Sequence, residues 1–301
     1  MIERISAQHL YTGEAGEAFA LLSQDPAYRE VCDAVNWREI CVQFAHDYPE
    51  TVVLLGCGDM RSERQVLGWL QSRPVVVAHE LETNHATQAH LTTCYEITNT
   101  SATPKYILGA DFEKLHVGCD FAHLPDAIAR LRKFRWVRQP YLFTLVGHTL
   151  GNQPNTREFL QLLRRCVGDY EYLIADVAIA TPEDPRLTGE WRPPTAEAEW
   201  YRAAARAHFR KSADEIFLTK VDLPDGYELR VVARRGSRLV VVLSRLRRSL
   251  EGWIASANLA GFRCVRSTLG RARGATVAGL LLAPTHAQVA PAGVGGIDGC
   301  H

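Results

Sequence analysis

The sequence predicts an α/β protein with a doubly wound, mostly parallel sheet of seven strands. From residue 51 onward, short runs of apolar, β-branched residues alternate with amphipathic segments, as in TVVLLG, RSERQVLGWLQS and RPVVVAHE. This alternation is typical of parallel sheets, because each helix carries the chain back to the start of the next strand. Near the carboxyl end, a helix precedes two apolar runs joined by a tight connection, which predicts one antiparallel strand in the same sheet.

The expected elements follow in order along the chain. Residues 15–47 have helical spacing interrupted at Pro26, which predicts two helices before the sheet. Parallel strands are expected at 51–56, 73–80, 105–111, 140–147 and 170–179, with helices at 61–72, 82–100, 121–134 and 155–168. After residue 178 we expect a helix at 198–209 and strands at 215–224, 227–236 and 238–246, joined by the turn formers Pro224, Asp225, Gly226, Gly236 and Ser237. A last helix at 249–262 and strands at 263–270 and 275–284 complete the sheet.

This order divides the chain into a core and the segments that cover it. The expected parts are an N-terminal helical segment that helps cover the site (1–50), a Rossmann-like core (51–177), an inserted α+β substrate-recognition region (178–246), the last core helix and strands (247–284), and a flexible tail (285–301).

The composition favours a small-molecule partner. The chain has 301 residues, with 34 Lys plus Arg against 34 Asp plus Glu. A balanced charge without a long basic run argues against nucleic-acid binding, and apolar runs too short to span a bilayer argue against a membrane protein. The eight cysteines form no CxxC pair and the histidines have no metal-ligand spacing, so no metal is expected. We expect a cytoplasmic monomer or homodimer.

The ends of the first three expected strands carry residues suited to a nucleoside. Gly56, Cys57 and Gly58 follow the first strand, where glycines let the backbone approach a ligand or simply form a tight turn. The dinucleotide fingerprint GxGxxG is missing because Arg61 occupies its last position, which disfavours a pyrophosphate-bearing cofactor.

The second and third expected strands add acids and an aromatic ring. Glu80 is placed to accept the hydroxyls of a ribose, and Asp111 with Phe112 to hold an adenine by its amine and by stacking. Any one of these acids is equally explained as a solvated helix cap. Together the three strand ends predict a site for S-adenosylmethionine.

A more specific resemblance begins after the fourth strand. The segment Leu142 to Pro154, LFTLVGHTLGNQP, resembles a signature of the ergothioneine-pathway histidine-specific methyltransferases, a branch of the class I S-adenosylmethionine-dependent methyltransferases. GCG at 56–58, Glu80 and GADFEKL at 109–115 match in order and spacing, and residues 11–28 match more weakly. The resemblance covers residues 51–177 well and 178–247 only loosely, and it implies a Rossmann-like class I methyltransferase fold.

The resemblance also implies roles for individual residues. Those expected to contact the cofactor are Tyr11, Gly56, Cys57, Gly58, Glu80, Asp111, Phe112 and Gly147. Asn152 would bind the carboxylate or amine end of an amino-acid substrate, and Tyr28 would close over it. The family recognises the imidazole with Glu-x-Ser, whereas this chain has Val242, Leu243 and Ser244. The acid is missing, so we expect an acceptor other than histidine.

Several residues are candidates for catalysis or acceptor binding. Tyr28, and less directly Glu199 or Tyr201, could take a proton from an amine acceptor. His148, where the family has a small residue, is either a base or a space-filling side chain. Trp191, Trp200 and Tyr201 form either an aromatic wall around the acceptor or ordinary packing. Arg245, Arg247 and Arg248 are expected to form a solvated face, with pairing to an acidic acceptor as the alternative.

The sequence therefore predicts a methyltransferase that uses S-adenosylmethionine, yields S-adenosylhomocysteine, and N-methylates an amino acid or a derivative. Two alternatives stay open: O-methylation of a small carboxylate or hydroxyl, and a non-catalytic nucleoside-binding protein.

Overall fold

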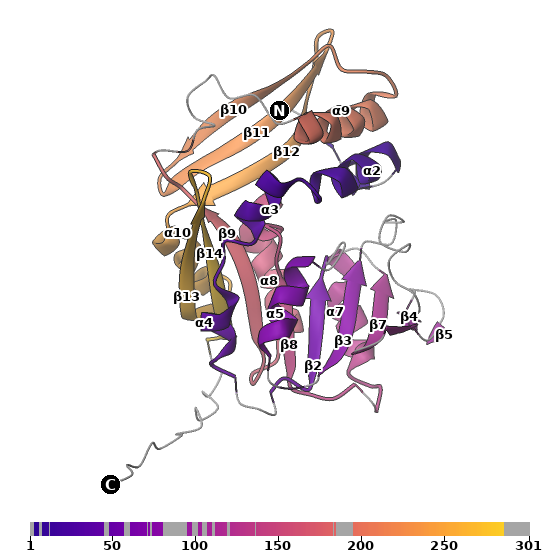
Figure 1. The fold of residues 1–301 in the computed structure, drawn as a ribbon, viewed down its shortest axis with the longest axis vertical. Coiled ribbons are helices and arrows are strands. Elements are labelled where there is room, and N and C mark those ends of the chain that lie inside the picture. Colours follow the sequence, from indigo (N-terminus) through magenta and orange to yellow (C-terminus); the bar gives the residue numbers. More distant parts are fainter. Residues whose placement is uncertain are drawn as a thin grey trace.

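The structure is a computed structural model of the chain. This structure describes residues 3–5, 8–11, 13–44, 48–56, 61–70, 72, 74–80, 95–97, 102–103, 107–109, 112–118, 121–135, 137–182, 184 and 195–285. The tail expected over 285–301 lies outside these residues except for Thr285. Two lobes lie one above the other, and the arrows of β2 and β3 in the lower lobe point toward the upper one (Figure 1).

The lower lobe contains the expected seven-stranded sheet. Its strands lie in the order β7 (Phe112–Gly118), β3 (Val75–Glu80), β2 (Thr51–Leu55), β8 (Tyr141–Leu145), β9 (Tyr172–Ile179), β14 (Ala275–Pro284) and β13 (Phe262–Ala272). All neighbouring pairs are parallel except those that involve β14. This is a doubly wound, mostly parallel Rossmann-like sheet, and the predicted fold class is confirmed.

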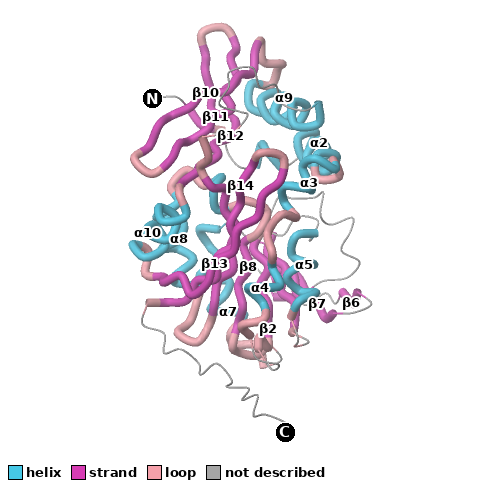
Figure 2. Tube along the Cα trace, turned by 60° about the vertical axis from the view of Figure 1, so that its left-hand side comes forward, coloured by secondary structure: helices cyan, strands magenta, loops and turns pink. Residues whose placement is uncertain are grey.

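Helices cover both faces of this sheet because its strands are apolar on both sides. In β2, Val53 and Leu55 join one core cluster with side chains of α7 (Leu124–Leu131), α8 (Thr156–Cys166) and α10 (Leu250–Leu259). Val52 and Leu54, which point the other way, pack with α4 (Trp37–Cys41) and α5 (Arg61–Trp69). Figure 2 shows β13 and β14 passing in front of this layered core.

The third strand differs from the sequence prediction. The run expected at 105–111 contains only the short β6 (Ile107–Gly109), which forms an antiparallel pair with β7 (Phe112–Gly118). It is β7 that pairs in parallel with β3. The apolar run ILGA suggested the strand, but the mixed FEKLHVG that follows occupies its place, since packing in the sheet overrides local apolarity.

The helix expected at 82–100 is also wrong where the structure describes it. Residues Tyr95–Ile97 form β4, which pairs with β7 and with β5 (Ala102–Thr103). Threonines around this segment have branched Cβ atoms, which favour strands over helices.

The upper lobe consists of a second sheet and one long helix. Its strands β10 (Glu215–Leu223), β11 (Gly226–Arg235) and β12 (Arg238–Arg248) form an antiparallel meander, with β1 (Glu3–Arg4) parallel to β12. Helix α9 (Thr195–Phe209) packs on this sheet. β12 extends past the expected boundary at 246, and its last residue Arg248 pairs with Ile179 of β9, which joins both lobes into one sheet of fourteen strands.

The N-terminal segment connects the lobes. Helices α1 (Gln8–Tyr11) and α2 (Gly13–Leu22) pack against α9, and α3 (Pro26–Cys32) lies between the lobes (Figure 1). The expected break at Pro26 is a helix start: Asp25 Oδ1 accepts hydrogen bonds from the backbone N–H groups of Ala27 (2.8 Å) and Tyr28 (3.1 Å). Among the described residues, no helix is long and apolar enough to cross a membrane.

Candidate functional site

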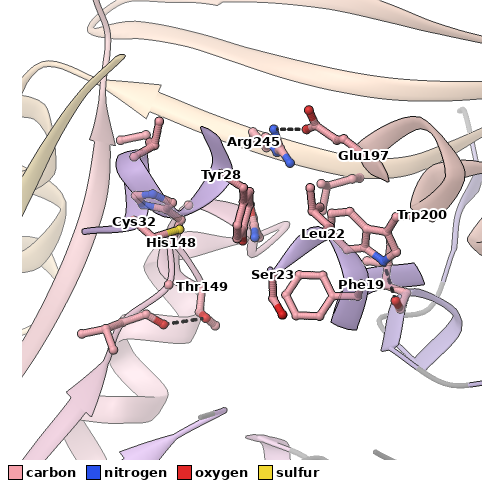
Figure 3. A pocket seen from close by; sticks show the side chains of 18 of the residues that line it. Phe19, Leu22, Ser23, Tyr28, Cys32, His148, Thr149, Glu197, Trp200 and Arg245 are labelled. Carbon is pink, nitrogen blue, oxygen red and sulfur yellow. Dashed lines mark hydrogen bonds and ion pairs between the residues drawn. The ribbon is translucent and has the colours of Figure 1, made fainter. Parts of the chain in front are cut away.

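A cavity of about 810 Å³ lies between the two lobes, at the carboxyl ends of the core strands. It is lined by residues that follow β2 and β8, by α3 from the N-terminal segment, and by β12 and α9 from the upper lobe. Figure 3 shows side chains from these elements facing one another across it. Residues from four distant parts of the sequence therefore form one site.

One end of the cavity is formed by Gly56 and Phe121. Gly56 has a φ of 62°, and a Cβ at this position would lie 3.4 Å from Phe121 Cζ. A side chain at residue 56 would be strained and would contact the ring. Phe121 lies in the short helix η1 (Phe121–His123), and its ring packs edge-on against Phe159 at 4.9 Å between centroids. Gly56 and Phe121 thus lie against each other in the cavity wall, and the Phe121 ring lines the cavity.

Phe121 is a residue that the sequence prediction missed. The chain contains two Asp-Phe pairs, Asp111-Phe112 and Asp120-Phe121, and the prediction selected the first. Phe112 is the first residue of β7 and so stands at its amino end, at the sheet edge opposite the cavity. The second pair follows the carboxyl end of β7, and this order was the sequence signal that could have identified it.

The other cofactor-binding candidates are placed only in part. Glu80 ends β3, and its backbone lies at the same edge of the sheet as the end of β2. Gly147 lines the cavity with a φ of 83°. Cys57, Gly58 and Asp111 lie outside the described residues. Their roles stay predictions.

An aromatic cluster joins the N-terminal segment to the upper lobe. Tyr11, Phe19 and Trp200 line the cavity, with ring centroids 5.0 to 5.8 Å apart. Trp200 Nε1 donates a hydrogen bond to the Leu10 carbonyl at 2.6 Å. Trp200 therefore both packs the lobe and faces the cavity.

Two neighbouring candidates on α9 do not reach the cavity. Tyr201 is buried and its hydroxyl donates to Glu197, so its role in substrate binding stays a prediction. Glu199 is exposed and pairs with Arg202. Trp200 of the same helix lines the cavity, because neighbouring residues of a helix point in different directions. Trp191 lies outside the described residues.

His148 and Asp176 form a dyad in the cavity region. The His148 backbone N–H donates to Asp176 Oδ1 at 2.9 Å, and the ring Nδ1 lies 3.1 Å from Asp176 Oδ2. His148 has a φ of 62°, a conformation in which a non-glycine residue is strained. Asp176 is buried in β9, and this burial raises the pKa of its carboxyl while His148 lowers it. The sequence signal for Asp176 was an acid inside an apolar strand.

Tyr28 and Cys32 lie beside this dyad on α3 (Figure 3). Burial raises the pKa of the Tyr28 hydroxyl well above its ordinary value, and a hydrogen bond to Cys32 raises it further. Burial also raises the pKa of the Cys32 thiol to about 12. Tyr28 therefore stays protonated near neutral pH and is a donor at this site.

We expect the Tyr28→Phe variant to keep the pH dependence of kcat that the wild type shows, because a phenol that stays protonated contributes no titration near neutral pH. The loss should appear in acceptor KM, by about tenfold or less for one neutral hydrogen bond. Steady-state kinetics between pH 6 and 9 measure both, with the range set to the ordinary titration of histidine. A pH profile altered by this substitution would restore Tyr28 as the base.

Arg245, Arg247 and Arg248 do not form a solvated face. Arg247 is buried, with its Nε 3.2 Å from Asp184 Oδ2, and Arg248 Nη1 lies 3.0 Å from Asp225. Arg245 lines the cavity, and its Nη1 lies 2.7 Å from Glu197 Oε1. The expectation is wrong because β12 has the inserted helix on one side and the core on the other.

Asn152 and Ser244 complete the described wall. Asn152 lies in η2 (Leu150–Asn152), half-buried, and its backbone N–H donates to Thr149 at 3.2 Å. Ser244 of β12 is buried in the same wall. Across the described part of the chain, no three His, Cys, Asp or Glu side chains lie grouped as metal ligands.

No family model and no curated protein matches the chain. Among solved structures, it is similar to an S-adenosylmethionine-dependent methyltransferase from Clostridium acetobutylicum, with 10% identity, 90% of this chain and 97% of that chain covered, and a TM-score of 0.49. It is also similar to the 1,6-didemethyltoxoflavin-N1-methyltransferase of Burkholderia thailandensis, with 12% identity, 95% of this chain and 93% of that chain covered, and a TM-score of 0.45. A third similar structure is human N-acetylserotonin methyltransferase, with 11% identity, 91% of this chain and 57% of that chain covered, and a TM-score of 0.45. At this level of similarity, the fold assignment rests on the strand order.

Proposed function

We propose that the chain is an S-adenosylmethionine-dependent methyltransferase that methylates a nitrogen of a small molecule, an amino acid or a derivative. The observation that carries the proposal is the cavity at the carboxyl edge of this sheet, with Gly56 and Phe121 at one place in its wall and His148, with Asp176 next to it, at another. Ligands of doubly wound sheets bind at this edge. The sequence resemblance to the ergothioneine-pathway enzymes supports the same activity. That the chain belongs to that family stays a prediction.

The residues present fit the adenosine part of this cofactor. The Phe121 ring lines the cavity beside Gly56, and an aromatic ring in a cavity wall is a surface on which a base can stack. Glu80, at the end of β3, is positioned in the chain to accept the ribose hydroxyls. When bound, S-adenosylmethionine would supply a methyl group activated by a sulfonium: the acceptor lone pair would form the new bond to the methyl carbon as the bond to sulfur breaks, with its electron pair left on a neutral thioether.

The protein's own contribution is to align the acceptor, exclude water and accept a proton. The N-terminal helices and the upper lobe cover the cavity. His148 Nδ1 lies 3.1 Å from Asp176 Oδ2, which favours the tautomer with the proton on Nδ1. Nε2 is buried in this structure, so His148 accepts the proton that the acceptor nitrogen loses only when the imidazole turns toward the cavity. The strained backbone of His148 is maintained by its N–H bond to the same carboxylate.

Two observations favour different acceptor atoms. The rings of Tyr11, Phe19 and Trp200 favour a nitrogen acceptor, since aromatic faces stabilise a methylammonium product. The dyad also suits a hydroxyl acceptor, because a hydroxyl must lose its proton before it becomes a good nucleophile. O-methylation is therefore the second candidate.

The proposal is tested by incubating the protein with S-adenosylmethionine and a panel of amino acids, amines and hydroxylated small molecules. Formation of S-adenosylhomocysteine with a methylated product by mass spectrometry is the expected result, and fragmentation of the product assigns N or O. Binding of S-adenosylhomocysteine without turnover of any acceptor would favour the non-catalytic alternative.

The Asn152→Ala variant should mainly raise acceptor KM, by about tenfold or more, because it removes a hydrogen-bonding side chain from the cavity wall. Affinity for S-adenosylhomocysteine by calorimetry should stay near the wild-type value. Equal losses of acceptor and cofactor affinity would show instead that Asn152 supports the structure of the loop.

A further inference from the structure

Arg245 is a cation in the wall of a largely apolar cavity. It comes from β12 of the upper lobe, and its side chain keeps 20% of its surface exposed. Figure 3 shows its guanidinium paired with Glu197 above Tyr28. A guanidinium stays protonated in proteins, so Arg245 is a permanent cation here, and the Glu197 carboxylate that balances it also lines the cavity. Burying such a charge is unfavourable unless it is well paired.

The pairing of Arg245 within the described residues is partial. Its ion pair there is with Glu197, through Nη1 and a single carboxylate oxygen at 2.7 Å. The same oxygen, Oε1, also accepts the Tyr201 hydroxyl. The guanidinium lies over the Tyr201 ring, with its carbon 5.8 Å from the ring centroid. A guanidinium has five N–H donors in a planar fork, and one oxygen contact leaves most of them available for a ligand.

Other arginines that line the cavity have a different environment. Arg247 is almost fully buried against Asp184, and Arg273 and Arg4 are more exposed and bind Glu30 and Glu228. Arg29 is exposed, and its Nε donates to the Ser23 carbonyl at 3.2 Å. Of these five, Arg245 is the partly buried one whose guanidinium lies over an aromatic ring, that of Tyr201. A charge-assisted hydrogen bond is stronger at a partly buried site than in water.

We infer that Arg245 binds a carboxylate of the methyl acceptor, with its guanidinium held in place by Glu197 beside it and the Tyr201 ring beneath it. The inference rests on the proposed function and narrows its substrate class to small carboxylic acids with an apolar portion beside Phe19 and Trp200. Arg245 is a single cation and already pairs with Glu197, so the site suits a ligand with one negative charge. A phosphate dianion would need further cations to balance its charge. Arg245, rather than Asn152, then distinguishes an acid from its amide.

A carboxylate in this cavity has two possible sources, the acceptor and the amino-acid portion of the cofactor. The upper-lobe position of Arg245, on a different element from Gly56 and Phe121, favours the acceptor. The two sources are separated by comparing S-adenosylhomocysteine with 5′-methylthioadenosine, which lacks the amino-acid portion. If Arg245 binds the acceptor, both nucleosides should bind Arg245→Gln as they bind the wild type.

The test measures binding by calorimetry, with and without saturating S-adenosylhomocysteine. The probes are leucine, phenylalanine, tyrosine, tryptophan, phenylacetate and indole-3-acetate, each paired with its primary amide. The proteins are the wild type, Arg245→Gln, the double variant Arg245→Gln/Glu197→Gln, and Arg238→Gln. The double variant removes both charges of the ion pair, so that Glu197 is not left without its partner. Arg238 lies on the same strand, outside the cavity, in an exposed pair with Glu3 at 3.4 Å.

We expect at least one acid to bind wild type and Arg238→Gln about tenfold or more tightly than its amide, and this preference to vanish in both Arg245 variants. A panel in which no acid binds better than its amide overturns the inference, as does a preference that survives in the double variant. Weaker binding of S-adenosylhomocysteine but not 5′-methylthioadenosine to Arg245→Gln also overturns it, because the carboxylate is then the cofactor's. Failure of the wild type to bind either nucleoside counts against the proposed function. The inference about Arg245 is tested independently, by whether acids bind more tightly than their amides when no nucleoside is present.

Discussion

Replacing His148 with asparagine is expected to lower kcat by about 10²–10⁴-fold, the usual contribution of a positioned general base. Asparagine is chosen because it tolerates the left-handed backbone of this position, where φ is 62°. The side chain lies beside the cavity with Nδ1 3.1 Å from Asp176, so its loss removes the proton acceptor while the loop is kept. Single-turnover kinetics with an identified acceptor, and calorimetry with S-adenosylhomocysteine, measure the two effects.

The control for this experiment is His208→Asn, a histidine in the upper lobe that lies 3.4 Å from Glu3 and outside the cavity. It should leave kcat unchanged. Asp176→Asn should lower kcat in the same direction as His148→Asn and alter the pH dependence, because Asp176 acts by positioning the imidazole and fixing its tautomer. A His148→Asn enzyme with near-normal kcat would mean that His148 only fills space.

The second large effect is expected at Asp120. We expect Asp120→Ala to weaken S-adenosylhomocysteine binding by about tenfold or more, because an acid at the end of the third parallel strand can accept a charge-assisted hydrogen bond from the adenine amine. The structural basis is the position of Phe121, the next residue, against Gly56 in the cavity. Calorimetry with S-adenosylhomocysteine gives the dissociation constants.

Asp111→Ala is the matched control, since Asp111 belongs to the other Asp-Phe pair and precedes the amino end of β7. Its affinity for S-adenosylhomocysteine should equal that of the wild type. The opposite outcome, with a loss at Asp111 and none at Asp120, would show that the pair first selected from the sequence binds the adenine.

The sequence prediction succeeded where local patterns were strong. Four runs, at 51–55, 75–80, 141–145 and 172–179, are largely apolar at successive positions, a pattern typical of strands that helices cover on both faces. All four form parallel strands of the sheet. The hairpins of the upper lobe were equally clear, because Gly226 and Gly236 mark turns between alternating strands.

The prediction failed where several segments competed for one place in the fold. Both 105–111 and 112–118 had strand character, and only the pairing with β3 decides which segment occupies the sheet. This choice also decides that Phe121 and not Phe112 stands at the cavity edge, because the carboxyl end of a parallel strand and its amino end lie at opposite edges.

By itself, the sequence determined the doubly wound, mostly parallel core, the α+β segment after the fifth parallel strand and the glycine turn after the first strand, because these depend on hydrophobic periodicity and on backbone conformations that few residues adopt. Only the tertiary structure decided which segment pairs with β3, that Phe121 lies against Gly56, that Asp176 lies against His148, and that Arg245 and Glu197 pair in the cavity wall. These contacts join residues far apart in the chain, and their distances follow from how the strands align and the lobes pack rather than from any local pattern.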